Sequence, residues 1–225
     1  MTRKHFAMLV ICAICGAVDL PSSFRGNVGS LNQADPLNRQ IRSTVIKGET
    51  IDQVLGILTA EYGIPIGIEL GDPTLTPRRE IDLSLPETNV KNFLDSLVAK
   101  DPRYTWKLEG GVIHFRPVTG RDSLLTTLLD TKISHFAFTG GVTRYHIHNE
   151  VMNLPEIRSQ LVVAGVDPMI FLNFGNMKKF EKEIFFDESN LTLRELLDRI
   201  IVKTDMKRWV LARWGENGEF ITLKS

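Results

Sequence analysis

The sequence predicts an α+β protein made of two tandem βαββαββ units, each with its helices packed on one face of a small mixed sheet. Three observations support this prediction. Apolar residues alternate at strand spacing in some segments and recur at helical spacing in others. Gly, Pro and Asn separate these segments as turn signals. Finally, the segment 80–108 is similar to the segment 183–211, which indicates a duplicated unit.

The repeat is best described by an offset of 103 residues (183 − 80). Identical residues at this offset are Glu80 and Glu183, Leu94 and Leu197, Asp95 and Asp198, Lys100 and Lys203, Trp106 and Trp209, and Leu108 and Leu211. The apolar pattern repeats as well, since Ile81, Leu83, Val90, Phe93, Leu97 and Val98 align with Ile184, Phe186, Leu193, Leu196, Ile200 and Ile201. We interpret both tryptophans as core residues and both aspartates as solvated helix positions.

Length and composition set the broad class. The chain has 225 residues, 43% of them hydrophobic, which is enough for one large or two small globular cores. Lys+Arg and Asp+Glu are both 27, so no net charge draws the protein to nucleic acid, and we expect no nucleic-acid partner.

The N-terminus has the layout of an export signal. Arg3 and Lys4 precede an apolar stretch from 6 to 18, and Asp19 begins a polar region. The apolar stretch is shorter than the ~20 residues that a membrane-spanning helix needs. We predict a signal peptide at 1–17 cleaved after Ala17, no transmembrane segment after cleavage, and a periplasmic or secreted mature protein.

Both cysteines, Cys12 and Cys15, lie inside this leader. An apolar export segment does not favour a reactive thiolate, so their C-x-x-C spacing is not interpreted as a redox site. A lipid anchor on Cys15 is the alternative, although Ile14 stands where a small residue is expected. After cleavage the chain has no cysteine, and its stability must come from packed cores.

The first unit is predicted at 42–118, after a flexible tether at 18–41 that is rich in Pro, Gly, Ser and Asn. A strand at 42–47 leads to a helix opened by the capping box Thr50-x-x-Gln53 and closed by Gly63. The remaining elements are strands at 64–70 and 81–85, a helix from Thr88 that stops before Pro102, and strands at 104–109 and 112–116 joined by Gly110-Gly111.

A connector helix and strand are predicted at 119–142, with the helix at 120–130, and the second unit at 143–225. Its elements are a strand at 145–150, a helix opened by Asn153-x-x-Glu156, strands at 169–173 and 179–186, a helix at 191–203, and a hairpin of 207–213 and 219–223 around Asn217-Gly218.

The order strand, helix, strand, strand, helix and terminal hairpin, ending in Gly111-Val112-Ile113-His114-Phe115-Arg116-Pro117, resembles the short periplasmic module at the N-terminus of secretins and TonB-dependent transducers. The resemblance covers residues 42–117. It implies a small protein-binding domain without catalytic residues. The chain departs from those families because nothing after the module is suited to form a secretin pore or an outer-membrane barrel.

The two units differ on the strand face away from their helices. The first has Gly67, Glu69, Asp82 and Lys107, which predict a solvated face, at the positions where the second has Ile170, Leu172, Phe185 and Val210. Exposing four such apolar side chains forgoes roughly 1.5–3 kcal/mol each, so we predict that this face binds a partner. The leucine-rich connector helix, the first unit, and a separate protein or second copy are the three candidates to cover it.

His146, His148 and Glu150 form the sharpest polar pattern. On a strand they point to one face and resemble a metal-ligand set. Such pairs are more often surface residues of a strand, so we expect no metal and no cofactor. No Gly-x-Ser-x-Gly, His-Glu-x-x-His or phosphate-binding glycine loop is present.

Together these features predict a non-enzymatic, exported protein-interaction or assembly module of the cell envelope. It would bind a protein partner through a sheet edge or through the apolar outer face of the second unit. The alternatives are a metal-dependent periplasmic enzyme using His146 and His148, and a lipid-anchored accessory subunit of an envelope complex.

Overall fold

The computed structural model describes residues 35–75, 77–140, 143–168, 184–215 and 217–224, which belong to the compact unit Ala34–Ser225. The predictions for the leader at 1–17, its two cysteines and residues 18–34 of the tether lie outside the described residues. So do the predicted strand at 169–173 and most of the predicted strand at 179–186.

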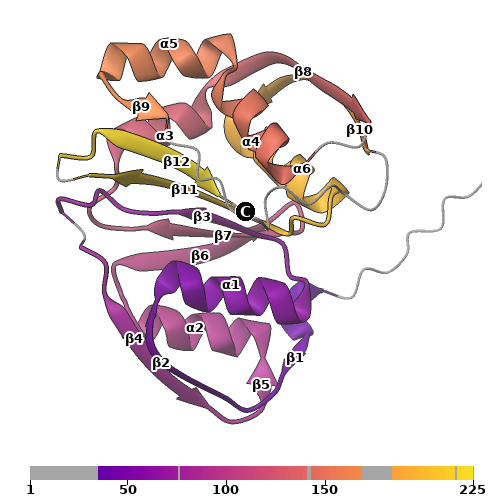
Figure 1. Ribbon diagram of the computed structural model, residues 1–225. Helices are drawn as coiled ribbons and strands as arrows, with labels where there is room; N and C mark the ends of the chain where they lie inside the picture. Colours follow the sequence, from indigo (N-terminus) through magenta and orange to yellow (C-terminus); the bar gives the residue numbers. More distant parts are fainter. Residues whose placement is uncertain (1–34, 76, 141–142, 169–183, 216, 225) are drawn as a thin grey trace, which may run out of the picture. The chain divides into compact units, whose positions relative to one another are not determined.

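The described residues form an α+β fold with six α-helices and mixed sheets (Figure 1). The helices are α1 (Ile51–Tyr62), α2 (Val90–Lys100), α3 (Ser123–Asp130), α4 (Arg144–Met152), α5 (Pro155–Ala164) and α6 (Leu193–Lys203), preceded by the 3₁₀ helix η1 (Pro36–Asn38). The strands are β1 (Gln40–Ile41), β2 (Thr44–Thr50), β3 (Ile66–Glu69), β4 (Glu80–Leu85), β5 (Thr88–Asn89), β6 (Tyr104–Glu109), β7 (Val112–Pro117), β8 (Lys132–Gly140), β9 (Asp167–Pro168), β10 (Ile184–Thr192), β11 (Arg208–Trp214) and β12 (Phe220–Lys224).

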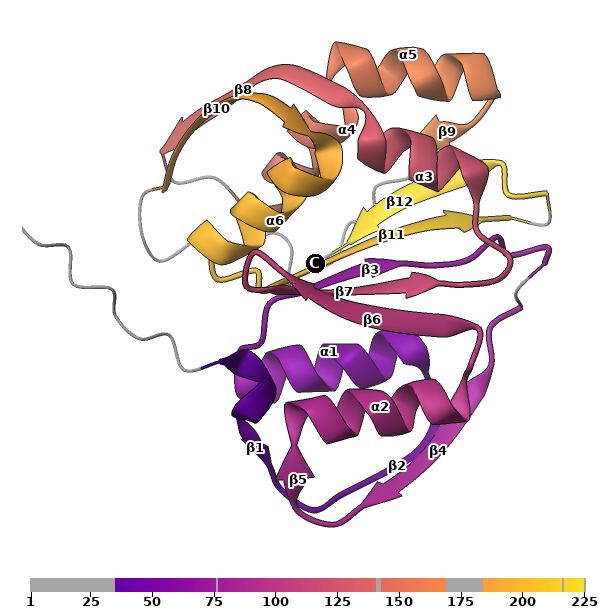
Figure 2. The ribbon, with the colours of Figure 1, turned by 180° about the vertical axis from the view of Figure 1, so that it is seen from behind.

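A six-stranded mixed sheet with the order β6-β7-β3-β11-β12-β9 lies at the centre. Its parallel pairs are β7–β3, β3–β11 and β12–β9, and its antiparallel pairs are β6–β7 and β11–β12. The helices α1 and α2 lie on one side, between this sheet and the antiparallel pair β2–β4 (Figure 1). The other side carries α3 and α6, with the antiparallel pair β8–β10 beyond them (Figure 2).

The central strand β11 takes part in two hydrophobic cores. Val210 and Ala212 pack into the core formed with α1 and α2, whereas Trp209 and Leu211 pack into the core formed with α3 and α6. This alternation follows from the period of two in a strand, which sends successive side chains to opposite faces. The parallel β3–β11 pairing, which we call the seam, therefore joins the two halves of the chain through one sheet.

The seam also covers the face of β3 that the sequence predicts to be solvated. A Cβ atom at Gly67 would collide with the indole ring of Trp209, so the close approach of the ring requires glycine. Glu69 is only 3% exposed, and its carboxylate lies 3.3 Å from the guanidinium of Arg194 on α6 and accepts a hydrogen bond from the Thr126 hydroxyl at 3.3 Å. The prediction of a solvated face is thus wrong for β3, because the second half of the chain covers that face.

Local signals in the first half form as expected. Thr50 and Gln53 make the predicted capping box, and Gly63 closes α1 in the left-handed conformation with φ 60°. Gly110 and Gly111 both have positive φ in the tight turn between β6 and β7. In these places a short sequence pattern determines the backbone by itself.

The start of the second half differs from the prediction. Residues 145–150 belong to the helix α4, and not to a strand, because Thr143 accepts a hydrogen bond from the His146 N–H and caps the helix. The predicted box of Asn153 and Glu156 does not form, since Leu154 precedes α5 and Pro155 begins it. Glu156 instead accepts hydrogen bonds from the backbone and hydroxyl of Ser134.

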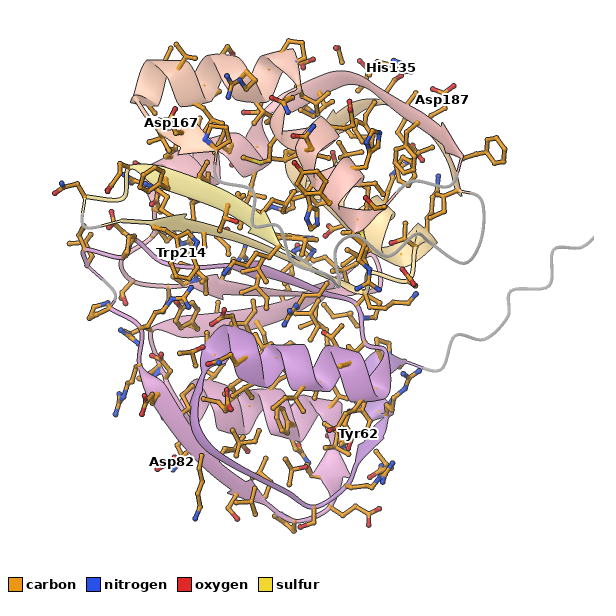
Figure 3. The ribbon with its side chains drawn as sticks, viewed as in Figure 1. Tyr62, Asp82, His135, Asp167, Asp187 and Trp214 are labelled. Carbon is orange, nitrogen blue, oxygen red and sulfur yellow. The ribbon has the colours of Figure 1, made fainter. Side chains whose placement is uncertain are left out.

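The end of the predicted tether is also structured. Asp35 caps the short helix η1, and Gln40 pairs with Asn89 to extend β1 along β5. Ile41 is buried in the core beside α1 and α2. On the opposite side of the molecule, His135 and Asp187 lie 2.9 Å apart on the exposed face of β8 and β10 (Figure 3). Across the described residues, no helix has both the length and the apolar character to cross a membrane.

Candidate functional site

The helix α4 separates the two histidines that the metal hypothesis brings together. His146 is half-exposed and lies 3.8 Å from the Glu150 carboxylate, whereas His148 is 2% exposed and its ring nitrogens have no hydrogen-bond partner among the described residues. Residues two apart on a helix point to different sides. In the described part of the chain, no three His, Cys, Asp or Glu side chains are grouped as a metal site. The strand geometry that the metal hypothesis requires is therefore not formed.

Burial has a second effect on His148. It lowers the pKa of the imidazole from 6.5 to about 4, and the charge of Arg144 contributes further in the same direction. His148 is therefore neutral at pH 7 and is an interior residue of the protein.

Of the four residues predicted to form a partner-binding face, Val210 and Phe185 are described, and these two do not share one surface. Val210 is 2% exposed and packs in the core beside α1 and α2, so it is not available to a separate partner. Phe185 is 69% exposed on β10. Ile170 and Leu172 lie outside the described residues. Of the three candidates to cover the predicted face, the first half of the chain is the one that covers Val210, because β11 is a central strand of the shared sheet.

Both aspartates that the sequence places on solvated helix surfaces bind tryptophans. The Trp106 indole N–H donates to Asp95 at 3.1 Å, and the Trp209 indole N–H donates to Asp198 at 2.8 Å. The second aspartate also lies 3.2 Å from the buried imidazole of His114. The identities Asp95/Asp198 and Trp106/Trp209 at the same offset are the sequence signal for this paired contact.

A cleft of about 170 Å³ opens where the two halves meet. We call it the Trp214 cleft. It is lined by residues from the start of α1, the loop after β3, the turn before β6 and the end of β11, including Asp52, Arg78, Arg79, Arg103, Arg213 and Trp214. Trp214 lies at the end of β11, which brings it beside segments more than a hundred residues earlier in the chain (Figure 3).

Two of the four arginines in the cleft are held in ion pairs. Arg103 makes two hydrogen bonds to the carboxylate of Asp101, at 2.8 and 2.7 Å, and this contact raises the pKa of the guanidinium. Arg213 donates to the fully buried carboxylate of Asp122 at 3.1 Å. These pairs fix the walls of the cleft and neutralise their own charges.

Two other cations, Arg78 and Lys224, lie against the indole ring of Trp214. The guanidinium carbon of Arg78 lies 3.7 Å from the centre of the Trp214 ring, and the Lys224 ammonium lies 4.1 Å from it. The carboxylate of Asp52 lies 4.0 Å from Arg78, beyond hydrogen-bond distance. Sequence reasoning missed this site, because its residues are distant in the chain and match no motif.

A second hollow, of about 390 Å³, lies between the β6–β7 turn and α6. Glu188 in its wall binds both Arg199 and Lys203, and Lys203 lowers the pKa of the Glu188 carboxyl. The charges of this hollow are thus largely paired with one another, which makes it a weaker candidate for ligand binding than the Trp214 cleft.

No family model, curated protein or solved structure matches the chain. Function is therefore inferred from its own residues and contacts.

Proposed function

We propose that the chain is an exported, non-enzymatic docking module of the cell envelope, built of two related halves, that binds a protein partner along the edge strand β6. The observation that carries the proposal is the seam. There, β11 of the second half pairs in parallel with β3 of the first. Strand β6 is the counterpart of β11 at the offset of 103, and among the described strands it pairs only with β7.

The relation between the halves is supported by their strand order. The first half contributes β6-β7-β3 and the second contributes β11-β12-β9, with an antiparallel pair followed by a parallel pair in each. The helices α2 and α6 begin and end 103 residues apart. The element order β2-α1-β3-β4-α2-β6-β7 of the first half is also the order from which the resemblance to the secretin and transducer module is inferred.

The backbone of β6 offers the groups that its counterpart uses at the seam. The carbonyl of Lys207 accepts a hydrogen bond from Ile66 of β3 at 3.0 Å, and the carbonyl of Leu211 accepts one from Leu70, directly after β3, at 3.1 Å. In β6 the Arg103 carbonyl accepts from Val118 at 2.7 Å, so alternate residues from 103 onward face β7. The backbone of Trp106 and Leu108 therefore faces away from β7. A partner strand added there would gain main-chain hydrogen bonds for affinity and side-chain contacts for specificity.

The edge also carries features that limit indiscriminate pairing. Lys107 and Glu109 lie on β6 with their charged groups 2.5 Å apart, and both are substantially exposed. Charged residues on an edge strand disfavour aggregation while leaving the backbone available to a specific partner.

The proposal is tested by photo-crosslinking in cells, with a crosslinking amino acid at Glu109 and a control placement at Lys91 on α2. The variant Leu108→Pro removes an N–H that faces outward, and proline is tolerated on the open side of an edge strand. The matched variant Leu108→Ala removes the same side chain and keeps the N–H. We expect one crosslinked partner at Glu109 that persists in Leu108→Ala and is lost in Leu108→Pro, with both variants folded by circular dichroism. Equal crosslinking in both variants refutes docking on β6.

Export is tested separately by cell fractionation and mass spectrometry of the purified chain. We expect a mature N-terminus at Val18 and loss of export when residues 2–17 are deleted. A lipid-modified Cys15 at the mature N-terminus would instead assign the protein to the lipid-anchored class.

A further inference from the structure

We propose that the Trp214 cleft binds a phosphate group. The inference is independent of docking on β6, because it concerns side chains around the start of α1 and the end of β11. Its basis is the combination of a stacked guanidinium, an excess of positive charge and a helix N-terminus around one cavity.

The guanidinium of Arg78 is positioned to bind an oxyanion. Its carbon lies over the Trp214 ring, 3.7 Å from the ring centre, so the group is held against the ring face. A stacked guanidinium keeps its N–H donors at the rim of that plane, where they match the two oxygens of a phosphate or carboxylate. Asp52 at 4.0 Å is too far away to occupy these donors with a hydrogen bond. The aromatic ring thus preorganises Arg78 for a ligand.

The charge balance favours a dianion. The Arg103–Asp101 and Arg213–Asp122 pairs neutralise their own charges. The other charged residues of the described lining are Arg78, Arg79 and Asp52. Arg208 adds a further positive charge beside the cleft, since its guanidinium donates to the Asp52 backbone carbonyl at 3.1 Å and not to the carboxylate. With Lys224 on the same indole ring, and with Asp72, whose carboxyl feels the charge of Arg213, these groups carry four positive charges against two negative charges. A phosphate group brings about −1.5 to −2 at pH 7, which a single carboxylate does not.

Two further observations agree with a positive electrostatic potential in the cleft. Burial and then the charge of Arg78 lower the pKa of Lys224, which lies on the same indole ring. In addition, α1 is a twelve-residue helix whose N-cap Thr50 and first residues Ile51 and Asp52 line the cleft. The N-terminus of such a helix carries a partial positive charge and is a common site for phosphate.

The size of the cleft admits a phosphate with a small organic group attached. Its volume is about 170 Å³, and a cavity of roughly 150 Å³ accommodates benzene. Phosphate reaches an envelope protein from two sources, a soluble phosphate or phosphate ester and the headgroup of a lipid. Both present the same group to Arg78, so the experiment has one arm for each.

The test is a titration of the purified full-length mature protein, labelled with ¹⁵N, with inorganic phosphate. The three indole N–H resonances belong to Trp106, Trp209 and Trp214, and the first two are held by aspartates elsewhere. We expect only the Trp214 resonance to shift and to saturate. Arg78→Gln should weaken binding about tenfold or more, as for loss of a charged hydrogen bond. The control Arg158→Gln removes the same charge from the exposed side of α5 and should leave binding unchanged.

The second arm measures flotation with vesicles of neutral lipid that contain phosphatidic acid. Vesicle binding displaced by free phosphate assigns a lipid headgroup, whereas phosphate binding without vesicle binding assigns a soluble ligand, and both support the site. The proposal is overturned if phosphate leaves the Trp214 resonance unmoved or if Arg78→Gln, with an otherwise unchanged spectrum, titrates as the wild type does. Equal binding of acetate would overturn the assignment to phosphate.

Discussion

The buried His148 should make the folded state sensitive to mild acid. Its pKa is about 4 in the folded chain and 6.5 for a solvated imidazole. Above pH 6.5 the group is neutral in both states and contributes no pH dependence. As the pH falls below 6.5 the unfolded chain takes up a proton that the folded chain does not, so stability is lost progressively until the pH passes through the folded pKa. With 1.36 kcal/mol for each unit of difference between the two pKa values, the full loss is about 3 kcal/mol.

The assay is urea denaturation at pH 7.5 and pH 4.5, followed by circular dichroism. The difference in pKa predicts that roughly 2.5 kcal/mol of the free energy of unfolding is lost over this interval through His148. The variant His148→Leu has a side chain of similar size and no titrating group, so this part of the pH dependence should disappear. The control His146→Gln removes an exposed histidine of the same helix and should keep it.

The carboxylates lose their stabilisation at lower pH than His148 does. Contacts such as that between Lys203 and Glu188 lower the folded pKa of several glutamates, so their stabilisation is present above the unfolded pKa of 4.5 and is lost as the pH falls below it. Comparing the variants removes this shared contribution. If His148→Leu and His146→Gln lose equal stability between pH 7.5 and 4.5, the reasoning from burial is refuted.

Three further changes test the packing at pH 7.5 by the same denaturation assay. Gly67→Ala places a methyl group against the ring of Trp209 and should lower the free energy of unfolding by about 1–3 kcal/mol, and an unchanged midpoint would contradict the close approach. Asp198→Ala should lower the free energy of unfolding by about 1–3 kcal/mol and Asp95→Ala by about 1 kcal/mol or less. The reason is that only Asp198 contacts a buried indole and a buried imidazole. Equal losses of stability in the two variants would argue against this difference. Glu69→Ala leaves Arg194 with the exposed carboxylate of Asp130, at 3.9 Å, as its counter-ion and should cost about 1–3 kcal/mol, whereas a cost below 1 kcal/mol would show that the Glu69–Arg194 pair is dispensable.

The first half was predictable from the sequence because its signals are local. The helix stop at Gly63, the turn at Gly110-Gly111 and the bounds of β6 each depend on a few neighbouring residues. The sequence did not predict the helix α4, because the local signal in that segment is ambiguous. Over six residues, the pattern His-Ile-His fits a strand as well as a helix, and the decisive cap at Thr143 precedes the segment that suggested the strand.

The sites could not be predicted from local patterns. The burial of Val210 depends on β11 being placed in the middle of the sheet, and the Trp214 cleft depends on the same strand carrying Trp214 to Arg78. The offset of 103 aligns Trp209 with Trp106, but it contains no information on which edge of the second half meets the first. Where they meet, Gly67 lies close against the ring of Trp209, a contact between residues far apart in the sequence.

The separation in sequence between the strands of the seam has a consequence for folding during synthesis. Ile66 pairs with Arg208, so about two thirds of the chain must be made between the emergence of one strand and the arrival of the other. Closing so long a loop is entropically costly and slow, and until it closes β3 presents an open backbone beside β7. Nascent or C-terminally truncated chains therefore expose the unpaired backbone edge of β3, which can associate with other chains and which the complete protein keeps in its interior.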